Sequence, residues 1–300
     1  MNVRRGLDWG KIAPLRLRAR LVAEGVYAGA HRSARRGAGV EFGGHRQYVA
    51  GDDLRWLDRR SLLLHDRLLV RQFETETDRA LRIIVDATAS MGYRGKDAPG
   101  AKLAFAALIA AALTRLAIGS GDPVGLGYIG GGPAARGVSV SSGREAFERA
   151  VGSLEACAPF GDSSVDHDML DRVLGGIARS ARRGSILVVL SDLLDLPDDA
   201  ADRIAAMATQ GRVLVVVQTL DPDEVRFPFE GTVRLRALEG HTVVETDADA
   251  KDRYLEALAR LENAWERALV GRGGRLVRAE TSDDPVRVVR NVIEAARGAG

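Results

Sequence analysis

Short apolar runs that alternate with amphipathic stretches dominate the chain from about residue 80 onwards. Apolar residues fill nearly every position of 81–86 (LRIIVD) and 186–191 (ILVVLS), a pattern typical of strands that are buried on both faces of a sheet. Runs of this kind predict strands at 81–86, 123–129, 137–141, 186–191, 213–219 and 275–279.

The segments between these runs have helical periodicity, as in the spacing of Leu170, Leu174 and Ile177. Helices are expected at 101–118, 145–157, 165–181, 200–208, 254–269 and 285–296. Two β-like runs around Gly240 predict a hairpin. Strands that alternate with helices imply right-handed crossovers between parallel strands. The predicted fold class is therefore α/β, a doubly wound and mostly parallel sheet with helices on both faces.

The first 78 residues lack this periodicity and are rich in arginine and glycine. We predict two parts, an N-terminal extension at 1–78 that packs on the main domain and an α/β domain at 79–300. The most apolar stretch, 103–118, contains Arg115 and falls short of the roughly 20 residues that span a bilayer, so we expect a buried helix. The N-terminus has no apolar segment of the kind that a signal peptide needs. A cytoplasmic protein without a membrane partner is expected.

Composition narrows the classes of function. Apolar residues make up 46% and charged residues 28%, which suits a chain that buries a core, whereas 5% aromatics argues against a stacking surface for single-stranded nucleic acid. The formal net charge is +2, and only four of the 43 basic residues are lysines. Arginine-driven nucleic-acid binding is an alternative that ranks below ion pairing within the protein. Cys157 is the only cysteine, which excludes a disulfide within the chain and fits a reducing compartment.

Candidate chemistry lies where two of the apolar strands end. The first strand leads into Asp86, Thr88 and Ser90 (DATAS), and the strand 186–191 is followed by Asp192. A third oxygen-rich loop, Gly-Asp-Ser-Ser, contains Ser163 and Ser164 and precedes a predicted helix. Because ligands of open parallel sheets collect at the carboxyl ends of the strands, these side chains are expected to converge.

Hydroxyl, carboxylate and water oxygens suit a hard divalent cation such as Mg²⁺ or Mn²⁺. We expect Thr88 and Ser90 to bind the ion directly, Asp86 and Asp192 to hold its waters, and Ser163 or Ser164 to close another side. One coordination position stays open for a carboxylate of a partner. The alternative interpretation is that Thr88 or Ser90 caps a helix and that Asp86 only ends a strand.

A hydrolase is the competing class of function. A strand that ends in Asp-x-Thr-x-Ser faintly resembles phosphatases of the haloacid dehalogenase type, but Thr88 stands where they carry a second aspartate and no lysine stands in a context that suggests catalysis. The chain also lacks the Gly-x-Ser-x-Gly and P-loop motifs. Catalysis is therefore disfavoured.

Asp86-x-Thr88-x-Ser90, a hydroxyl-bearing middle loop and a later strand-terminal aspartate resemble the metal-ion-dependent adhesion site of von Willebrand factor A domains. The usual first motif is Asp-x-Ser-x-Ser, and Thr88 keeps the hydroxyl. The middle position is normally threonine, whereas this chain offers Ser163 and Ser164.

A narrower resemblance covers most of the chain. In two sets of motif residues, one before the first strand of the sheet and one after the strand 213–219, the chain resembles the family catalogued as domain of unknown function 58. These residues are Glu41, Phe42, Arg46, Tyr48, Gly51, Asp52, Asp53, Arg55, Asp58, Val70, Arg71, Glu74, Asp221, Pro222, Glu224, Pro228 and Phe229. The resemblance implies a von Willebrand factor A-like domain that acts as an adaptor or co-chaperone, often encoded beside a MoxR-type AAA+ ATPase. The N-terminal motif residues either dock a partner or pin the extension to the main domain through ion pairs, and the second reading is favoured.

Overall fold

The computed structural model describes residues 15–30, 44–47, 69–72, 80–162, 166, 168–229, 234–236, 243–245 and 249–299. The chain divides into two compact units. The larger unit comprises Met1–His31 and Arg79–Gly300, and the smaller unit comprises Arg32–Asp78. Each unit is described by itself below.

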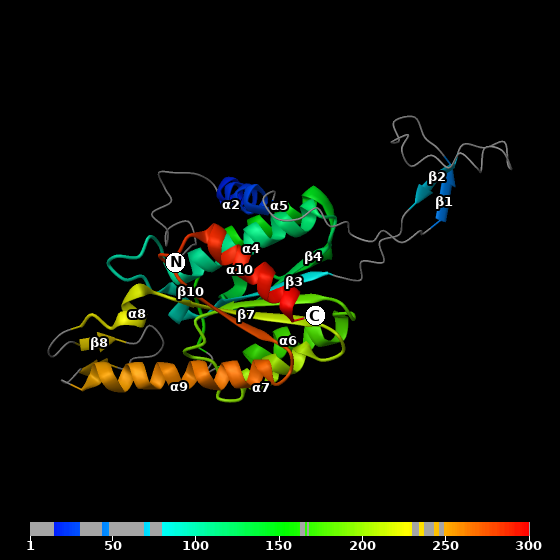
Figure 1. Cartoon of the computed structure of the whole chain (residues 1–300). Coiled ribbons are helices and arrows are strands. Elements are labelled where there is room, and N and C mark those ends of the chain that lie inside the picture. Colours follow the sequence, from blue (N-terminus) through cyan, green and yellow to red (C-terminus); the bar gives the residue numbers. More distant parts are fainter. Residues whose placement is uncertain are drawn as a thin grey trace. The chain divides into compact units, whose positions relative to one another are not determined.

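A six-stranded sheet forms the centre of the larger unit, with the strand order β10-β7-β6-β3-β4-β5 (Figure 1). Neighbouring strands pair in parallel except at the edge, where β5 runs antiparallel to β4. The strands are β3 (Leu81–Ala87), β4 (Val124–Gly130), β5 (Val138–Ser141), β6 (Ile186–Ser191), β7 (Val213–Leu220) and β10 (Arg275–Glu280). The predicted α/β class with a mostly parallel sheet is confirmed.

Helices cover both faces of this sheet (Figure 1). One layer contains α4 (Lys102–Gly119), α5 (Gly143–Ala156) and α10 (Pro285–Gly298), and the other contains α6 (Met169–Ser180), α7 (Ala200–Ala205) and α9 (Ala250–Val270). Each predicted strand and helix is present, and its ends differ from the predicted ones by at most four residues. The short 3₁₀ helix η5 (Ala206–Ala208) completes the helix that was predicted to follow β6.

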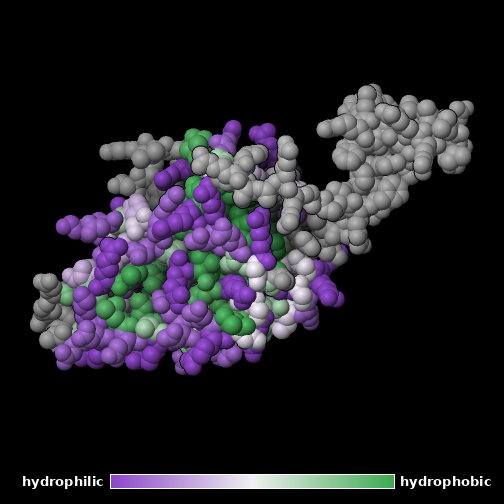
Figure 2. Space-filling view, in the orientation of Figure 1, coloured by the Kyte–Doolittle hydropathy of each residue, from purple (hydrophilic) through white to green (hydrophobic). Residues whose placement is uncertain are grey.

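The two faces of the sheet bury separate hydrophobic clusters because side chains alternate along each strand. In β3, Ile83 and Val85 face the layer of α4, whereas Ile84 faces the layer of α6. Helix α9 buries Trp265 and Leu269 on its inner side, and hydrophilic side chains line its outer side in the view of Figure 2. This layered core holds the carboxyl ends of the strands in fixed positions.

Helix α4 is apolar all round and lies within the core. In the described part of the chain it alone is long and apolar enough to cross a membrane by length and composition, and 83% of its most apolar window is buried inside the fold. The predicted buried helix is thereby confirmed. The localisation stays a prediction.

Helix α2 (Leu15–Ala30) lies within the segment that was expected to be irregular. It packs against α4 and α10, and it buries Leu15, Ala19, Val22 and Val26 at helical spacing. A Cβ atom on Gly25 would lie 2.9 Å from a methyl group of Val286, so glycine permits the close approach to α10. The expectation of an irregular segment was wrong here, because the arginines between the apolar residues of this stripe mask its helical periodicity.

Two pairs of strands and one short helix were either missed or only outlined by the sequence. In the smaller unit, β1 (Gly44–Gln47) pairs antiparallel with β2 (Leu69–Gln72). In the larger unit, β8 (Arg234–Arg236) pairs antiparallel with β9 (Val243–Glu245), as expected of a hairpin. The short helix α8 (Pro222–Arg226) follows β7 and was not predicted. Of the N-terminal motif, Tyr48, Asp52, Asp53, Arg55 and Asp58 lie outside the described residues.

Candidate metal site

The site lies at the carboxyl ends of β3 and β6, which are neighbours in the sheet. Val85 of β3 pairs with Leu190 of β6, so the two strands end side by side. The next residues along these strands are Asp86 and Ser191, and their side chains meet at the same edge of the sheet. The predicted convergence of the two strand ends is therefore present.

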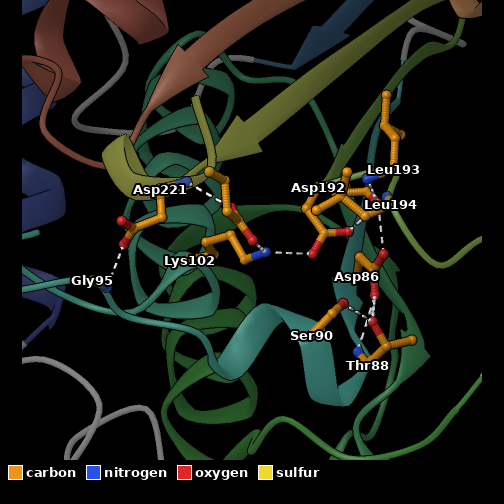
Figure 3. A network of polar contacts seen from close by, with 11 residues as sticks. Asp86, Thr88, Ser90, Gly95, Lys102, Asp192, Leu193, Leu194 and Asp221 are labelled. Carbon is orange, nitrogen blue, oxygen red and sulfur yellow. Dashed lines mark hydrogen bonds and ion pairs between the residues drawn. The ribbon is translucent and has the colours of Figure 1, made fainter. Parts of the chain in front are cut away.

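The first loop folds back on itself through the Asp86 carboxylate. Asp86 Oδ1 accepts hydrogen bonds from the backbone N–H of Thr88 (3.0 Å) and from Thr88 Oγ1 (2.7 Å). The hydroxyls of Thr88 and Ser90 lie 3.1 Å apart. Figure 3 shows these three side chains directed toward one another. The motif spacing thus brings three oxygen-bearing groups to one point.

Thr88 also occupies the N-cap position of the short 3₁₀ helix η3 (Ala89–Gly92), as the alternative interpretation proposed. Its hydroxyl makes no capping hydrogen bond, because it donates to Asp86 instead. The capping interpretation is therefore right about the position of Thr88 and does not account for its hydroxyl.

Backbone amides of the loop that follows β6 hold the side chains of Ser191 and Asp192. Ser191 Oγ donates to Asp86 Oδ2 (2.5 Å) and accepts from the N–H of Leu193 (3.0 Å). Asp192 Oδ1 accepts from the N–H of Leu194 (3.1 Å). Leu193 has a φ of 65°, a left-handed conformation that is uncommon for a non-glycine residue and recurs at functional sites. Asp192 is therefore fixed in direction.

A buried lysine completes this part of the network. Lys102 Nζ lies 2.7 Å from Asp192 Oδ2 and 2.5 Å from Glu224 Oε1 (Figure 3). The side chains of Lys102 and Asp192 are 0% and 1% exposed. Burial by itself lowers the pKa of Lys102, but the two carboxylates outweigh it and raise the pKa, so the ammonium stays charged. No lysine was expected at this site from the sequence, and the structure places Lys102 there.

The carboxylates of the site repel one another. The pKa of Asp86 is raised to about 6, first by burial and then by the nearby Asp192, while the hydrogen bonds from Ser191 and Thr88 oppose this shift. Burial and then Asp192 also raise the pKa of Asp195, whose side chain is hydrogen-bonded to Ser90. A bound cation would relieve this repulsion, because it supplies opposite charge where solvent is excluded.

The middle loop approaches the first loop through its backbone. The N–H of Ala89 donates to the carbonyl of Gly161 (3.0 Å), and the N–H of Phe160 donates to the carbonyl of Ala87 (2.8 Å). Gly130 (φ 72°) allows this approach, because a Cβ atom there would lie 2.8 Å from the carbonyl oxygen of Phe160. Ser163 and Ser164, the predicted ligands of this loop, lie outside the described residues.

The donor set fits a small divalent cation. Two ligands at right angles around Mg²⁺, with bonds of about 2.1 Å, lie about 3 Å apart, and the Thr88 and Ser90 hydroxyls are 3.1 Å apart. Asp86 and Asp192 supply negative charge beside them. Within the described part of the chain, no group of three or more His, Cys, Asp or Glu side chains could hold a metal ion.

Three ionisable residues of the site were not expected from the sequence, namely Lys102, Asp195 and Glu224. Lys102 carried a signal, since it is one of four lysines and begins the most apolar helix. Glu224 follows Asp221 with the spacing of a capping box, and both side-chain contacts of that motif are present. Asp195 gave no sequence signal, because it follows Asp192 in a loop without regular structure.

The strand order, the antiparallel edge strand β5 and the oxygen-rich strand ends define an α/β domain of the von Willebrand factor A type, as the resemblance predicted. The chain also matches a family model described as "Protein of unknown function DUF58" over residues 44–264, and it belongs to that family.

Curated relatives and solved structures are similar along most of the chain. The uncharacterized protein Rv1480 of Mycobacterium tuberculosis is 30% identical over 292 residues, which cover 95% of this chain and 89% of the relative. BatB from Bacteroides thetaiotaomicron is 18% identical with a TM-score of 0.47, covering 73% of this chain and 98% of that chain. The VWA domain of SpRpn10 is 11% identical with a TM-score of 0.36, covering 74% and 97% of the two chains.

Proposed function

We propose that this protein is a non-catalytic, metal-dependent protein-interaction module. Mg²⁺ or Mn²⁺ binds at the hydroxyls of Thr88 and Ser90 and holds a carboxylate of a protein partner. The observation that carries the proposal is the 3.1 Å separation of these hydroxyls beside the buried carboxylates of Asp86 and Asp192.

The side chains divide the work according to their present contacts. Thr88 donates its proton to Asp86, so the lone pairs of its oxygen remain for a cation. Asp86 and Asp192 balance the charge and hold water molecules of the ion. A hydroxyl of Ser163 or Ser164 is the proposed third direct ligand, and the backbone bond between Ala89 and Gly161 supports the proximity of that loop.

Phe160 provides an apolar contact for the partner at the rim of this site. Its side chain is 64% exposed, although its backbone is hydrogen-bonded to Ala87 and to Gly131. A large aromatic side chain on a fixed backbone loses little entropy on binding and is typical of interface hot spots. The proposed partner therefore presents a carboxylate for the ion and an apolar side chain for Phe160.

The family resemblance supports the choice of partner, a MoxR-type AAA+ ATPase. The cytoplasm is the proposed location. A hydrolase is less well supported, because the Lys102 ammonium is enclosed by Asp192 and Glu224 instead of facing a substrate. No small-molecule substrate is proposed, and nucleic-acid binding through arginines remains the third candidate.

Calorimetric titration with Mn²⁺ tests the metal site. Thr88→Val removes the hydroxyl at nearly constant volume, and we expect affinity to fall on the order of 10–100-fold, more when combined with Ser90→Ala. Thr209→Val is the matched control, because Thr209 is exposed and its hydroxyl bonds only the Ala206 carbonyl. Equal affinity for wild type and the Thr88→Val/Ser90→Ala variant would exclude direct coordination by these hydroxyls.

A pull-down with a MoxR-type AAA+ ATPase tests the partner. Recovery should fall in EDTA, in Thr88→Val and in Phe160→Ala. Val270→Ala, which alters another exposed apolar side chain (56%) at the end of α9, should have no effect. Equal recovery with and without EDTA would contradict metal-mediated binding. Phosphate-ester turnover abolished by Asp86→Ala would instead favour the hydrolase.

A further inference from the structure

Lys102 is an unusual residue for its position. It is the first residue of α4, yet its side chain is completely buried, and it is one of only four lysines beside 39 arginines. Lysine carries a compact charge with three donors, whereas the guanidinium of arginine is planar and larger. The small size of the ammonium therefore suits this enclosed position.

The ammonium of Lys102 bridges two carboxylates that come from different elements. Asp192 follows β6, and Glu224 lies in α8, which follows β7. The distances from Nζ are 2.7 Å to Asp192 Oδ2 and 2.5 Å to Glu224 Oε1. Nζ also lies over the Tyr93 ring, 5.8 Å from the ring centroid, which adds a cation–π contact.

The remaining oxygens of these two carboxylates are also occupied. Asp192 Oδ1 accepts from the N–H of Leu194, and Glu224 Oε2 accepts from the N–H of Asp221 (2.8 Å). Two buried carboxylates would repel each other strongly without a cation between them. Lys102 thus occupies a place where two acidic side chains, each fixed by a backbone amide, are directed at one positive charge.

We propose that the site has two cation positions. The second lies between Asp192 and Glu224, and the ammonium of Lys102 occupies it permanently. This inference rests on the proposed function for the first position, at Thr88 and Ser90. Because Asp192 Oδ2 and Glu224 Oε1 are bound to Lys102, a metal ion is confined to the side of the hydroxyls. The protein therefore binds one divalent ion, and Lys102 positions Asp192 beside it.

Two substitutions of Lys102 test this inference with Mn²⁺ as the probe. Lys102→Ala leaves both carboxylates and the space of the ammonium, so a second Mn²⁺ should bind. Lys102→Met removes the charge but fills the space, so no second Mn²⁺ should bind. Both variants should lose roughly 10 °C of melting temperature in EDTA, because two buried carboxylates lose their partner.

Calorimetry and thermal melting then separate the two variants. Saturating Mn²⁺ should raise the melting temperature of Lys102→Ala by roughly 5–10 °C more than that of wild type or Lys102→Met, with a stoichiometry of two ions. The inference would be overturned if Mn²⁺ raised the melting temperatures of the Ala and Met variants equally, or if Lys102→Ala bound only one Mn²⁺ ion. If Lys102→Ala does not fold in EDTA, its refolding yield with Mn²⁺ relative to Lys102→Met reports the same property.

The failure of this inference can be told apart from the failure of the proposed function. The rescue of Lys102→Ala by Mn²⁺ should persist when Thr88→Val and Ser90→Ala are added, because it needs only Asp192 and Glu224. If Mn²⁺ stabilises Lys102→Ala but does not bind the wild type, the proposed function fails and the inference about Lys102 stands. If the wild type binds one Mn²⁺ ion but Mn²⁺ does not stabilise Lys102→Ala, the proposed function stands and the inference fails.

Discussion

Single side chains around Ser90 determine how much negative charge the candidate site presents. Asp195 is hydrogen-bonded to Ser90, and its pKa is raised by burial and by Asp192, while Lys102 opposes the shift. Asp86 and Asp192 lie nearby, so three carboxylates share one small region. Lys102, at the start of α4, supplies a positive charge beside them. The affinity of an oxygen site for a divalent cation rises with the number of charged ligands around it.

Substitution of Asp195 by asparagine should therefore have opposite effects on the two states of the site. In EDTA, Asp195→Asn should keep or raise the melting temperature, because one repulsive charge is lost. In the Mn²⁺ titration, the same change should weaken binding about 10-fold, because the ion loses a nearby carboxylate. Asp252→Asn, on the exposed side of α9, should change neither quantity. Unchanged Mn²⁺ affinity in Asp195→Asn would place Asp195 outside the field of the ion.

The sequence predicted the residues at the ends of the two strands but not the charges that hold them. Asp86, Thr88, Ser90 and Asp192 could be found because each follows an apolar run at a fixed spacing, and the adjacency of β3 and β6 then follows from the fold. Lys102 meets Asp192 across 90 positions of sequence. A contact of that kind depends on how α4 lies on the sheet, which no local pattern encodes.

At the scale of elements, the loop before α4 and the helix α8 are fastened to each other. The N–H of Gly95 donates to Asp221 Oδ2 (2.8 Å), and Asp221 Oδ1 accepts from the N–H of Asp223 in the capping box of α8. Glu224 of the same box reaches Lys102 at the start of α4. The contacts of Lys102 and of Gly95 therefore depend on one another.

Gly95→Ala tests this connection. A Cβ atom at Gly95 would lie 2.3 Å from Asp221 Oδ1 and 2.3 Å from Asp223 Oδ2, so the loop must move and its hydrogen bond is lost. We expect the free energy of unfolding in urea to fall by about 2 kcal/mol. Gly152→Ala is the matched control, because its Cβ meets nothing within 4 Å inside α5, and it should raise stability by roughly 0.5–1 kcal/mol. Equal stability of the two variants would show that the loop and α8 are not coupled.

The elements of the sheet could be predicted because their signals are strong, and the missed elements show where such signals weaken. Buried strands such as β6 are apolar at almost every position, and α4 is apolar over most of its length. Helix α8 has only five residues, which is too short for periodicity, and its capping box was the available signal. Helix α2 has an apolar stripe, but alternating arginines and Gly25 obscure it.

At the scale of the whole molecule, the chain contributes to the larger unit twice. Helix α2 lies before residues 32–78 in sequence, yet it belongs to the same compact unit as β3 and everything that follows. It contacts α4, α5 and α10, and Arg290 of α10 donates to the carbonyl of Gly25 (2.6 Å). The larger unit is therefore assembled from two separate stretches of the chain, and α2 contributes Ala19 and Val22 to the hydrophobic cluster on its side of the sheet.

If α2 is part of the cooperative core, a polar side chain on its buried face should destabilise the entire larger unit. Ala19 is completely buried, and Ala19→Asp should lower the free energy of unfolding by roughly 3 kcal/mol, since an unpaired carboxylate would be buried. Leu21→Ser, at a position that is 57% exposed, should change it by no more than about 0.5 kcal/mol.

The decisive measurement is hydrogen exchange at the amides of β6, in the middle of the sheet. Ala19→Asp should speed that exchange by the factor that corresponds to its loss of stability, because β6 exchanges only when the whole unit opens. Unchanged exchange at β6 together with faster exchange in α2 would mean that α2 detaches alone and that the core consists of the later segment by itself.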